Sequence, residues 1–249
     1  MVSAMWSGRW DVRWFESLGS TNSYLLEQSA EGAVEGIVAV ADHQWAGRGR
    51  LDRRWESPAG SSLLTSILFR PTFDPAELHL CTAAVALAAA EACRRVAGVG
   101  PVIKWPNDLL VGEAKLAGVL AEADFTGDAC AVVVGIGINV AWPGPTTVQG
   151  TCLDDLCGEP VDRHMLLEAL LKALAPRRGL LDSPDGRQEL AAELRQRCAT
   201  LGQRIRVELA AEAISGVANE IDDAGRLIVQ TATGPRTVSA GDVVHLRPK

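Results

Sequence analysis

The sequence lacks the cysteine and histidine groupings that hold structural zinc. Its 249 residues include six cysteines and four histidines, and no two cysteines stand in a CxxC pair. Cys152 and Cys157 are close in sequence, but no second pair of ligands accompanies them. A metal site built on cysteine is therefore not expected. Scattered thiols in apolar stretches are typical of a reducing compartment and predict a cytoplasmic protein.

The chain also has few of the features that direct proteins to membranes or nucleic acids. Residues 1–10 hold no apolar run, so no signal peptide is expected. The most apolar window, residues 78–92, is alanine-rich and shorter than the ~20 residues of a membrane span, which predicts a core helix. A net charge of −7 argues against a general nucleic-acid binder. With 47% hydrophobic residues, the chain can bury a full core.

The remaining pattern predicts an α+β fold. β-branched and apolar runs predict strands at residues 36–41, 62–69, 101–105, 109–111, 115–123 and 130–140. Helices are predicted after an N-cap in Ser20-Thr21-Asn22 and at residues 76–97, 161–178 and 187–199. Beyond residue 201 apolar and polar residues alternate, as in a small antiparallel β module. Sheet and helices would fill residues 1–200, and the β module residues 201–249.

Positive charge and glycine are concentrated between the first two predicted strands, in residues 43–57. This segment holds two glycines and four arginines: Gly47, Gly49, Arg48, Arg50, Arg53 and Arg54. Glycine lets main-chain N–H groups approach a ligand, and guanidinium groups donate paired hydrogen bonds to phosphate oxygens. The connection is roughly nineteen residues long, and connections above about 12–15 residues are usually functional or disordered. The segment predicts a polyphosphate or acyl-phosphate site, although alone it also fits a solvated basic loop.

Residues 104–108 (KWPND) form a second candidate segment. Pro106 fixes its own φ and biases Trp105 to an extended conformation, so the chain turns sharply after a strand. Such a turn can present Lys104, Asn107 and Asp108 to a small ligand, or it can be an ordinary surface turn.

Two further segments place lysine and glycine within apolar strands. Lys115 precedes Leu-Ala-Gly118, where small residues leave room for a ligand against the backbone. Its charge would lie near a developing anion, although a lysine at a strand edge also guards against aggregation. Gly135 and Gly137 weaken a β-branched strand unless another group approaches the main chain. Asn139 follows at the end of this strand, where it could contact a ligand or cap a turn.

In this order and spacing, the motifs resemble the signature of biotin protein ligases, also called biotin–[acetyl-CoA-carboxylase] ligases. The segments that carry the resemblance are Ser20-Thr21-Asn22, Gln44, residues 47–50 with Arg53 and Trp55, and residues 104–108, 115–118 and 135–139. The C-terminal module resembles the family's small SH3-like domain. The resemblance implies a catalytic domain with a mixed β-sheet covered by helices, followed by an SH3-like β-barrel.

The family's activity, implied by this resemblance, has two steps. Biotin's carboxylate attacks the α-phosphorus of MgATP, which gives biotinyl-5′-AMP and pyrophosphate. A specific lysine of a biotin carboxyl carrier protein domain then attacks the mixed anhydride. Two anions must meet in the first step, so cations and Mg²⁺ have to offset their repulsion.

The resemblance also assigns roles to residues. Biotin would be bound by Ser20, Thr21, Asn22, Gln44, Gly47, Arg48, Gly49, Arg50, Lys115, Gly118, Gly135 and Gly137. ATP would be bound by Arg50, Arg53, Trp55, Lys104, Asn107, Asp108, Lys115 and Asn139. Lys115, Arg48 and Arg50 would be catalytic, with Lys115 bridging the reacting carboxylate and the α-phosphate. Asp108 would contact the metal.

The chain departs from the family pattern at two places. Leu51-Asp52 stands where many members have a glycine before the third arginine, and Asp52 could weaken phosphate binding or pair with Arg53 or Arg54. Nineteen residues precede Ser20, too few for the helix-turn-helix domain of roughly sixty residues in bifunctional members, so the monofunctional type is expected.

Two other functions remain as alternatives. A lipoate–protein ligase would use related chemistry but would need an apolar slot for a dithiolane ring. A nucleic-acid-binding module would use the Gly-Arg segment and the terminal β module. We expect neither nucleic acid nor membrane as a partner, and a monomer or weak homodimer.

Overall fold

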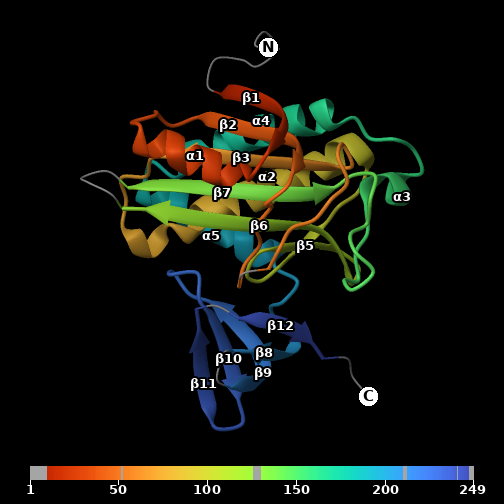
Figure 1. Cartoon of the computed structure of the whole chain (residues 1–249). Coiled ribbons are helices and arrows are strands. Elements are labelled where there is room, and N and C mark those ends of the chain that lie inside the picture. Colours follow the sequence, from red (N-terminus) through yellow and green to blue (C-terminus); the bar gives the residue numbers. More distant parts are fainter. Residues whose placement is uncertain (1–9, 52, 126–129, 210–211, 240, 247–249) are drawn as a thin grey trace.

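The computed structural model describes residues 10–51, 53–125, 130–209, 212–239 and 241–246 (Figure 1). Its strands are β1 (Asp11–Leu18), β2 (Ile37–Gln44), β3 (Ser62–Phe69), β4 (Val102–Lys104), β5 (Asp108–Val111), β6 (Ala114–Asp124), β7 (Ala131–Asn139), β8 (Arg204–Glu208), β9 (Ala213–Ile221), β10 (Leu227–Thr231), β11 (Gly234–Val238) and β12 (Asp242–His245). Its helices are the 3₁₀ helix η1 (Pro75–Glu77) and the α-helices α1 (Thr21–Ala30), α2 (His79–Ala97), α3 (Leu153–Cys157), α4 (Arg163–Leu180) and α5 (Pro184–Arg197).

A seven-stranded mixed sheet forms the centre of the larger part. Its strand order is β1-β2-β3-β7-β6-β5-β4. β1 runs parallel to β2, and the other neighbouring strands pair antiparallel. Every residue of β3 and β7 is buried, because these strands lie in the middle of a sheet that is covered on both faces. The expected mixed sheet with covering helices is confirmed.

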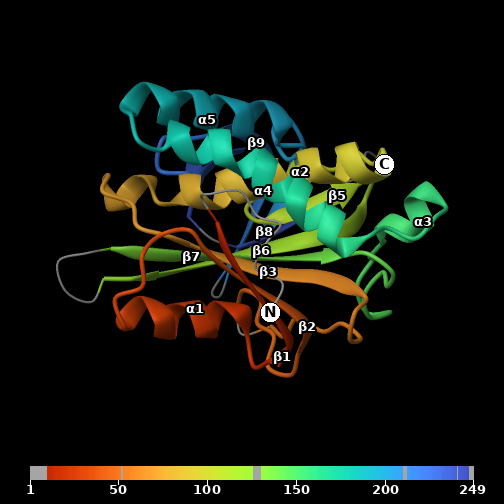
Figure 2. The same cartoon turned by 90° about the horizontal axis from the view of Figure 1, so that it is seen from above.

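Helices cover this sheet on both faces (Figure 2). α1 packs against β2, β3 and β7 on one face, whereas α2 lies on the other face with α4 and α5 packed upon it. The side chains of β7 alternate between the two resulting cores. Val132 and Val134 join the α2 core, and Ala131 and Val133 join the α1 core around Leu25. The two faces of β7 therefore have separate packing partners.

Helix α2 is built largely from small residues on its buried side. The buried alanines are Ala83, Ala84, Ala86, Ala88, Ala89, Ala90 and Ala92. The helix ends at Gly98, whose φ of 67° is the left-handed conformation that glycine adopts readily. Among the described residues, Pro75–Ala97 is the one helical stretch long and apolar enough to cross a membrane, and 67% of its most apolar window is buried in the molecule.

The C-terminal residues form a separate five-stranded antiparallel sheet of order β11-β10-β9-β8-β12. Its core includes Ile205 and Val229, and Trp105 from the end of β4 packs into it. The indole Nε1 of Trp105 also donates to the Gly225 carbonyl at 3.0 Å. The second sheet is thus attached to the first beneath β4 and β5 (Figure 1). The expected C-terminal β module is confirmed.

The ends of several elements differ from the expected ones. α4 begins at Arg163 because the Asp162 carboxylate accepts from the first backbone N–H groups. α5 begins three residues early, after Ser183, with Pro184 in its first turn. Helix α3 was not expected, and its five residues are too few for a periodic signal. The sequence also predicts a tight turn at Gly127-Asp128, and these residues lie outside the described part of the chain.

All six cysteines are free. Burial raises the pKa of the Cys81 and Cys93 thiols, both on α2, to about 12. These thiols stay protonated at neutral pH, and neither is suited to act as a nucleophile or a metal ligand.

Arg177 of α4 joins the three helices that cover one face of the sheet. Its guanidinium contacts Glu91 of α2 at 2.9 Å and Glu193 of α5 at 2.6 and 3.1 Å. Only 11% of the Arg177 side chain is exposed. Burial by itself would raise the pKa of Glu91, but the hydrogen bond and charge of Arg177 and the charge of Arg95 outweigh it and lower that pKa.

Arg177→Ala should lower the free energy of unfolding by about 3 kcal/mol, because it removes the ionic partner of the partly buried Glu193 and leaves Glu91 with Arg95 alone. Urea unfolding would measure the change. Arg236→Ala, which removes an exposed pair with Glu212, is the matched control and should change stability by less than about 1 kcal/mol.

Folding lowers the pKa of Glu91, so the ionised Glu91 stabilises the fold fully above its unfolded-state pKa. This stabilisation is lost as the pH falls through the folded-state pKa. The effect of Arg177→Ala should therefore shrink in acid.

Candidate functional site

The candidate site lies on the α1 face of the sheet, where β6 and β7 present glycine. Gly118 of β6 is the register partner of Gly137 of β7. A Cβ on Gly137 would come within 2.5 Å of the Trp55 ring, and one on Gly135 would overlap Asn22 Oδ1. These three positions form a floor of bare main chain that other segments approach closely.

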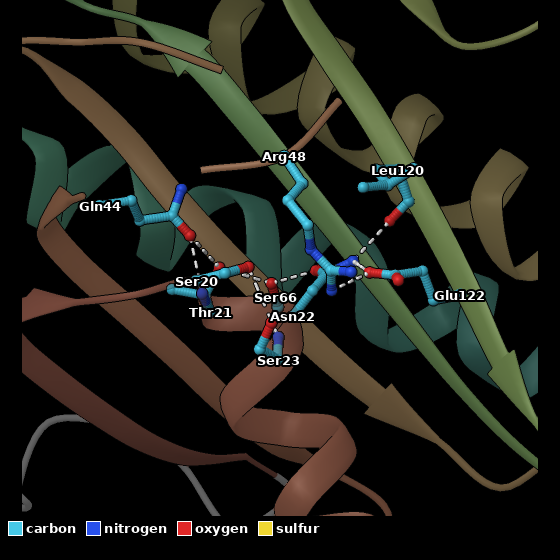
Figure 3. A network of polar contacts seen from close by, with 9 residues as sticks. All are labelled: Ser20, Thr21, Asn22, Ser23, Gln44, Arg48, Ser66, Leu120 and Glu122. Atoms are coloured by element: carbon cyan, nitrogen blue, oxygen red, sulfur yellow. Dashed lines mark hydrogen bonds and ion pairs between the residues drawn. The ribbon is translucent and has the colours of Figure 1, made fainter. Parts of the chain in front are cut away.

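A network of buried polar groups lies at one end of this floor (Figure 3). Ser20 caps α1, and the Thr21 backbone N–H and hydroxyl both donate to Gln44 Oε1, at 2.7 and 3.1 Å. The Ser66 hydroxyl lies 2.6 Å from both Thr21 Oγ1 and Asn22 Oδ1. These groups line a narrow cavity of about 30 Å³, here called the polar pocket. Fixed, desolvated donors and acceptors of this kind suit a neutral ligand group that hydrogen-bonds through both N–H and C=O.

Residues 47–51 and 53–55 form two hydrogen-bonded arms along the edge of this pocket, here called the arginine hairpin. The Trp55 N–H donates to the Gly47 carbonyl at 3.0 Å, and the Gly49 N–H donates to the Arg53 carbonyl at 2.7 Å. At its tip, Leu51 has a φ of 55°, a conformation that bulky residues rarely adopt. The segment thus has a defined conformation of its own.

Each arginine of the hairpin contacts a different part of the fold. The contacts are Arg48 to Glu122 of β6 at 2.8 Å, Arg50 to Asn107 at 3.1 Å, Arg53 to Asp242 of β12, and Arg54 to the Trp45 carbonyl at 2.6 Å. Asp52 is outside the described residues, so its effect on phosphate binding or pairing stays a prediction. Arg53 has an ionic partner in the C-terminal sheet, Asp242.

Trp55 separates the polar pocket from a second, larger cavity. Its ring lies over Gly118 and Gly137, and it lines both cavities. Lys115 Nζ is 5.6 Å from the ring centroid, within cation–π range. The buried indole Nε1 has no hydrogen-bond partner in the described part of the chain, so this donor is available to a ligand.

The larger cavity, of about 260 Å³, is lined by several cations, and we call it the cationic cavity. Lys115 Nζ lies in it, 2.6 Å from Asp108 Oδ1. The main chain of Lys115 is held on both sides, since its N–H donates to the Gln149 carbonyl at 2.8 Å and its carbonyl accepts from Thr151 at 2.9 Å. The segment after β7 therefore fixes the lysine in place.

Two asparagines shape the walls of the cationic cavity. Asn107 donates to the Val119 carbonyl at 2.8 Å, and its Oδ1 accepts from Arg50. Asn139 donates to the Thr151 carbonyl at 3.0 Å. Both amide groups orient neighbouring backbone or side chains while they line the cavity.

The two cavities contain every predicted site residue except Gly47 and Lys104. A Cβ on Gly47 would lie 2.5 Å from the Trp55 carbonyl, so this glycine serves the hairpin. Lys104 lies opposite Asp108 in the β4–β5 pair. The sequence reasoning missed Ser66, Glu122, Asp242 and residues 143–148. Ser66 could have been found as a polar residue within an apolar strand.

The electrostatics of the cationic cavity favour an anion. Burial lowers the pKa of Arg50, and the charges of Asp242 and Asp108 offset this in part. The guanidinium stays charged at neutral pH. The described residues hold no group of three or more histidines, cysteines or acids that could hold a metal by themselves. Asp108 offers a single carboxylate, which is enough for Mg²⁺ when phosphates supply the other ligands.

Comparison with known families agrees with this geometry. The biotin/lipoate A/B protein ligase family matches residues 14–139, and the biotin protein ligase C terminal domain matches residues 200–246. A biotin–[acetyl-CoA-carboxylase] ligase of Mycobacterium tuberculosis is 38% identical over 92% of this chain and 86% of its own length. Its counterpart in Paracoccus denitrificans is 33% identical over 90% and 96%.

Solved structures show the same arrangement. A biotin protein ligase from Aquifex aeolicus in complex with biotin and ATP superposes with a TM-score of 0.80 and 27% identity, over 96% of this chain and 99% of that one. Among the sequence relatives, a bifunctional ligase/repressor of Bacillus subtilis is 30% identical over 91% of this chain and 71% of its own length. The match to the biotin protein ligase C terminal domain, together with biotin ligases that match over most of the chain, disfavours the lipoate alternative.

Gly135→Ala should destabilise the fold by about 1–3 kcal/mol, because its Cβ would overlap an Asn22 amide that is hydrogen-bonded on both sides. Thermal unfolding would measure the change. At Gly100, a Cβ would meet nothing within 4 Å, so Gly100→Ala is the control and should leave the midpoint nearly unchanged. Equal midpoints for both variants would show that the floor can absorb a side chain.

Proposed function

The chain belongs to the biotin protein ligase family, and from that premise we propose how its residues perform the reaction. It is an ATP-dependent ligase that activates biotin as biotinyl-5′-AMP and transfers it to a lysine of a biotin carboxyl carrier protein domain. In the first step, a biotin carboxylate oxygen bonds to the α-phosphorus and pyrophosphate leaves. In the second, the lysine amine bonds to the acyl carbon, AMP leaves and the amine gives up a proton. The observation that carries the assignment is a polar pocket joined at Trp55 to a cationic cavity.

The polar pocket suits the ureido ring of biotin. Thr21, Gln44 and Asn22 supply hydrogen-bonding groups that are already oriented by one another. A ureido N–H can donate to the lone pairs that Thr21 Oγ1 and Asn22 Oδ1 still have free, whereas an apolar dithiolane offers no hydrogen-bonding group to them. Asn22 and Trp55 lie against the bare main chain at Gly135 and Gly137, so they form sides of the pocket that the ring would enter.

The cationic cavity suits the triphosphate and the reacting carboxylate. Arg48, Arg50 and Lys115 all line it, and Arg48 also lines the polar pocket. Guanidinium and ammonium groups that are held in position offset the repulsion between the two anions and the charge that develops on the α-phosphate oxygens. We assign Lys115 to the bridge between carboxylate and α-phosphate, since it is tethered on both sides of its main chain.

Mg²⁺ fits this arrangement through Asp108, which lies in the cavity beside Lys115. When bound, the ion would neutralise phosphate charge and orient the leaving pyrophosphate. Asp108 otherwise orients Lys115, and Asn107 orients Arg50.

The wider setting follows the same reasoning. We assign residues 1–200 to the catalytic domain and 201–249 to the SH3-like domain, as the sequence suggests. Free, largely buried thiols support a cytoplasmic setting. The acceptor is a biotin carrier domain, and we propose a monomer or weak homodimer that uses neither nucleic acid nor membrane.

Pyrophosphate–ATP exchange with purified protein and Mg²⁺ tests the proposed substrate. Biotin should support exchange because its ureido ring satisfies the polar pocket, whereas lipoate should not. Exchange with lipoate alone would reassign the enzyme to lipoate activation. Absence of exchange with both, in protein that unfolds cooperatively, would refute the proposed function.

Lys115→Ala should reduce biotin-dependent exchange by about 10²–10³-fold, because a charge aimed at the reacting phosphate is lost. Its unfolding midpoint should stay close to that of the wild type. Lys172→Ala, which removes an exposed lysine paired with Glu168 on α4, controls for loss of charge and should exchange normally. Wild-type exchange by Lys115→Ala would remove this residue from the mechanism.

A further inference from the structure

We propose that Glu122 is a positioning residue for biotin activation: its carboxylate holds Arg48 at the junction of the two cavities. The inference rests on the proposed function, since it concerns how Arg48 meets the carboxylate of biotin. Neither the sequence motifs nor the composition singled out Glu122.

Glu122 reaches the site because side chains alternate along β6. Gly118 and Leu120 line the polar pocket, and Glu122 follows two residues later on the same face. Figure 3 shows its carboxylate pointing toward Arg48 and Asn22. Its oxygen Oε2 accepts from both, at 2.8 Å in each case. One oxygen atom therefore links the pocket for the ureido ring to the cation that would meet the other end of biotin.

The amide of Asn22 is fixed by this contact. Its Nδ2 donates to Glu122 and to the Leu120 carbonyl, while its Oδ1 accepts from Ser66. All of its donors and one acceptor site are thus occupied, and the side chain is only 4% exposed. Glu122 consequently bonds to a group that cannot rotate without breaking other hydrogen bonds.

Arg48 depends on Glu122 more than Asn22 does. Its side chain is 43% exposed and extends from the arginine hairpin, and Glu122 is its one ionic partner among the described residues. Arginine has five N–H donors, so the bond from Nη2 to Glu122 leaves others for a ligand carboxylate. A long side chain held in advance loses less conformational freedom on binding.

The same pair should contribute little to the stability of the fold. Both partners are partly exposed, at 43% and 25%, and such pairs typically contribute about 0–1 kcal/mol. The effect of Glu122 should therefore appear in the KM for biotin, with little change in the unfolding midpoint.

The kinetic test compares Glu122→Gln, Arg48→Ala and the double variant in pyrophosphate–ATP exchange. Glutamine keeps an oxygen that can accept from Asn22 but removes the charge that holds Arg48. We expect the KM for biotin to rise about tenfold or more, with a smaller fall in kcat. Adding Glu122→Gln to Arg48→Ala should cause no further loss, because both changes remove the same interaction. Glu168→Gln, at an exposed pair on α4, is the control and should behave as wild type.

A second measurement needs no activity. Hydrogen exchange of the Gly49 and Trp55 amides, both bonded within the arginine hairpin, should be faster in Glu122→Gln than in the wild type without ligand. Faster exchange together with an inactive wild type would refute the proposed function and leave the contact to Arg48 supported.

The inference would be overturned by an unchanged KM in Glu122→Gln, by losses that add in the double variant, or by unchanged hydrogen exchange in the hairpin. A fall in the unfolding midpoint that accounts for the kinetic loss would also overturn it, because Glu122 would then be structural.

Discussion

Close approach of Asn22 and Trp55 to the bare main chain of β6 and β7 is the constraint from which the rest of the site follows. Gly118 and Gly137 face each other across the strand pair, so the sheet itself supplies no walls. The walls come from the start of α1, the arginine hairpin and the segment after β7. Because these segments are distant in sequence, the site exists only when the central strands are paired in register.

Charge imposes the second requirement, and the structure meets it locally. The chain carries a net charge of −7, yet the arginine hairpin and Lys115 make one cavity cationic. Every one of these cations lies near a carboxylate, an amide oxygen or a backbone carbonyl. Such partners offset the repulsion between neighbouring cations in the free protein, and they keep the cations oriented for an incoming anion.

The sequence was informative where a residue type has few structural explanations. Glycines in a β-branched strand indicated the floor, and arginines with glycines indicated an anion site. Contacts made by ordinary residues at long range could not be found this way. Glu122 lies 74 residues from Arg48 along the chain, and nothing in the local pattern of β6 distinguishes it from a solvent-facing acid. Lys104 belongs to the same motif as Asn107 and Asp108 but does not line either cavity, so its role in the ATP site stays a prediction.

The alanine-rich side of α2 has a consequence for how this protein can vary. A helix that packs through methyl groups offers almost nothing to remove, so most substitutions at its buried alanines add volume. Added volume in a filled core displaces its neighbours, and the neighbours of α2 are the back faces of β6 and β7. Larger residues on the buried side of α2 would thus displace β6 and β7, and with them the glycines that form the floor of the site on the opposite face.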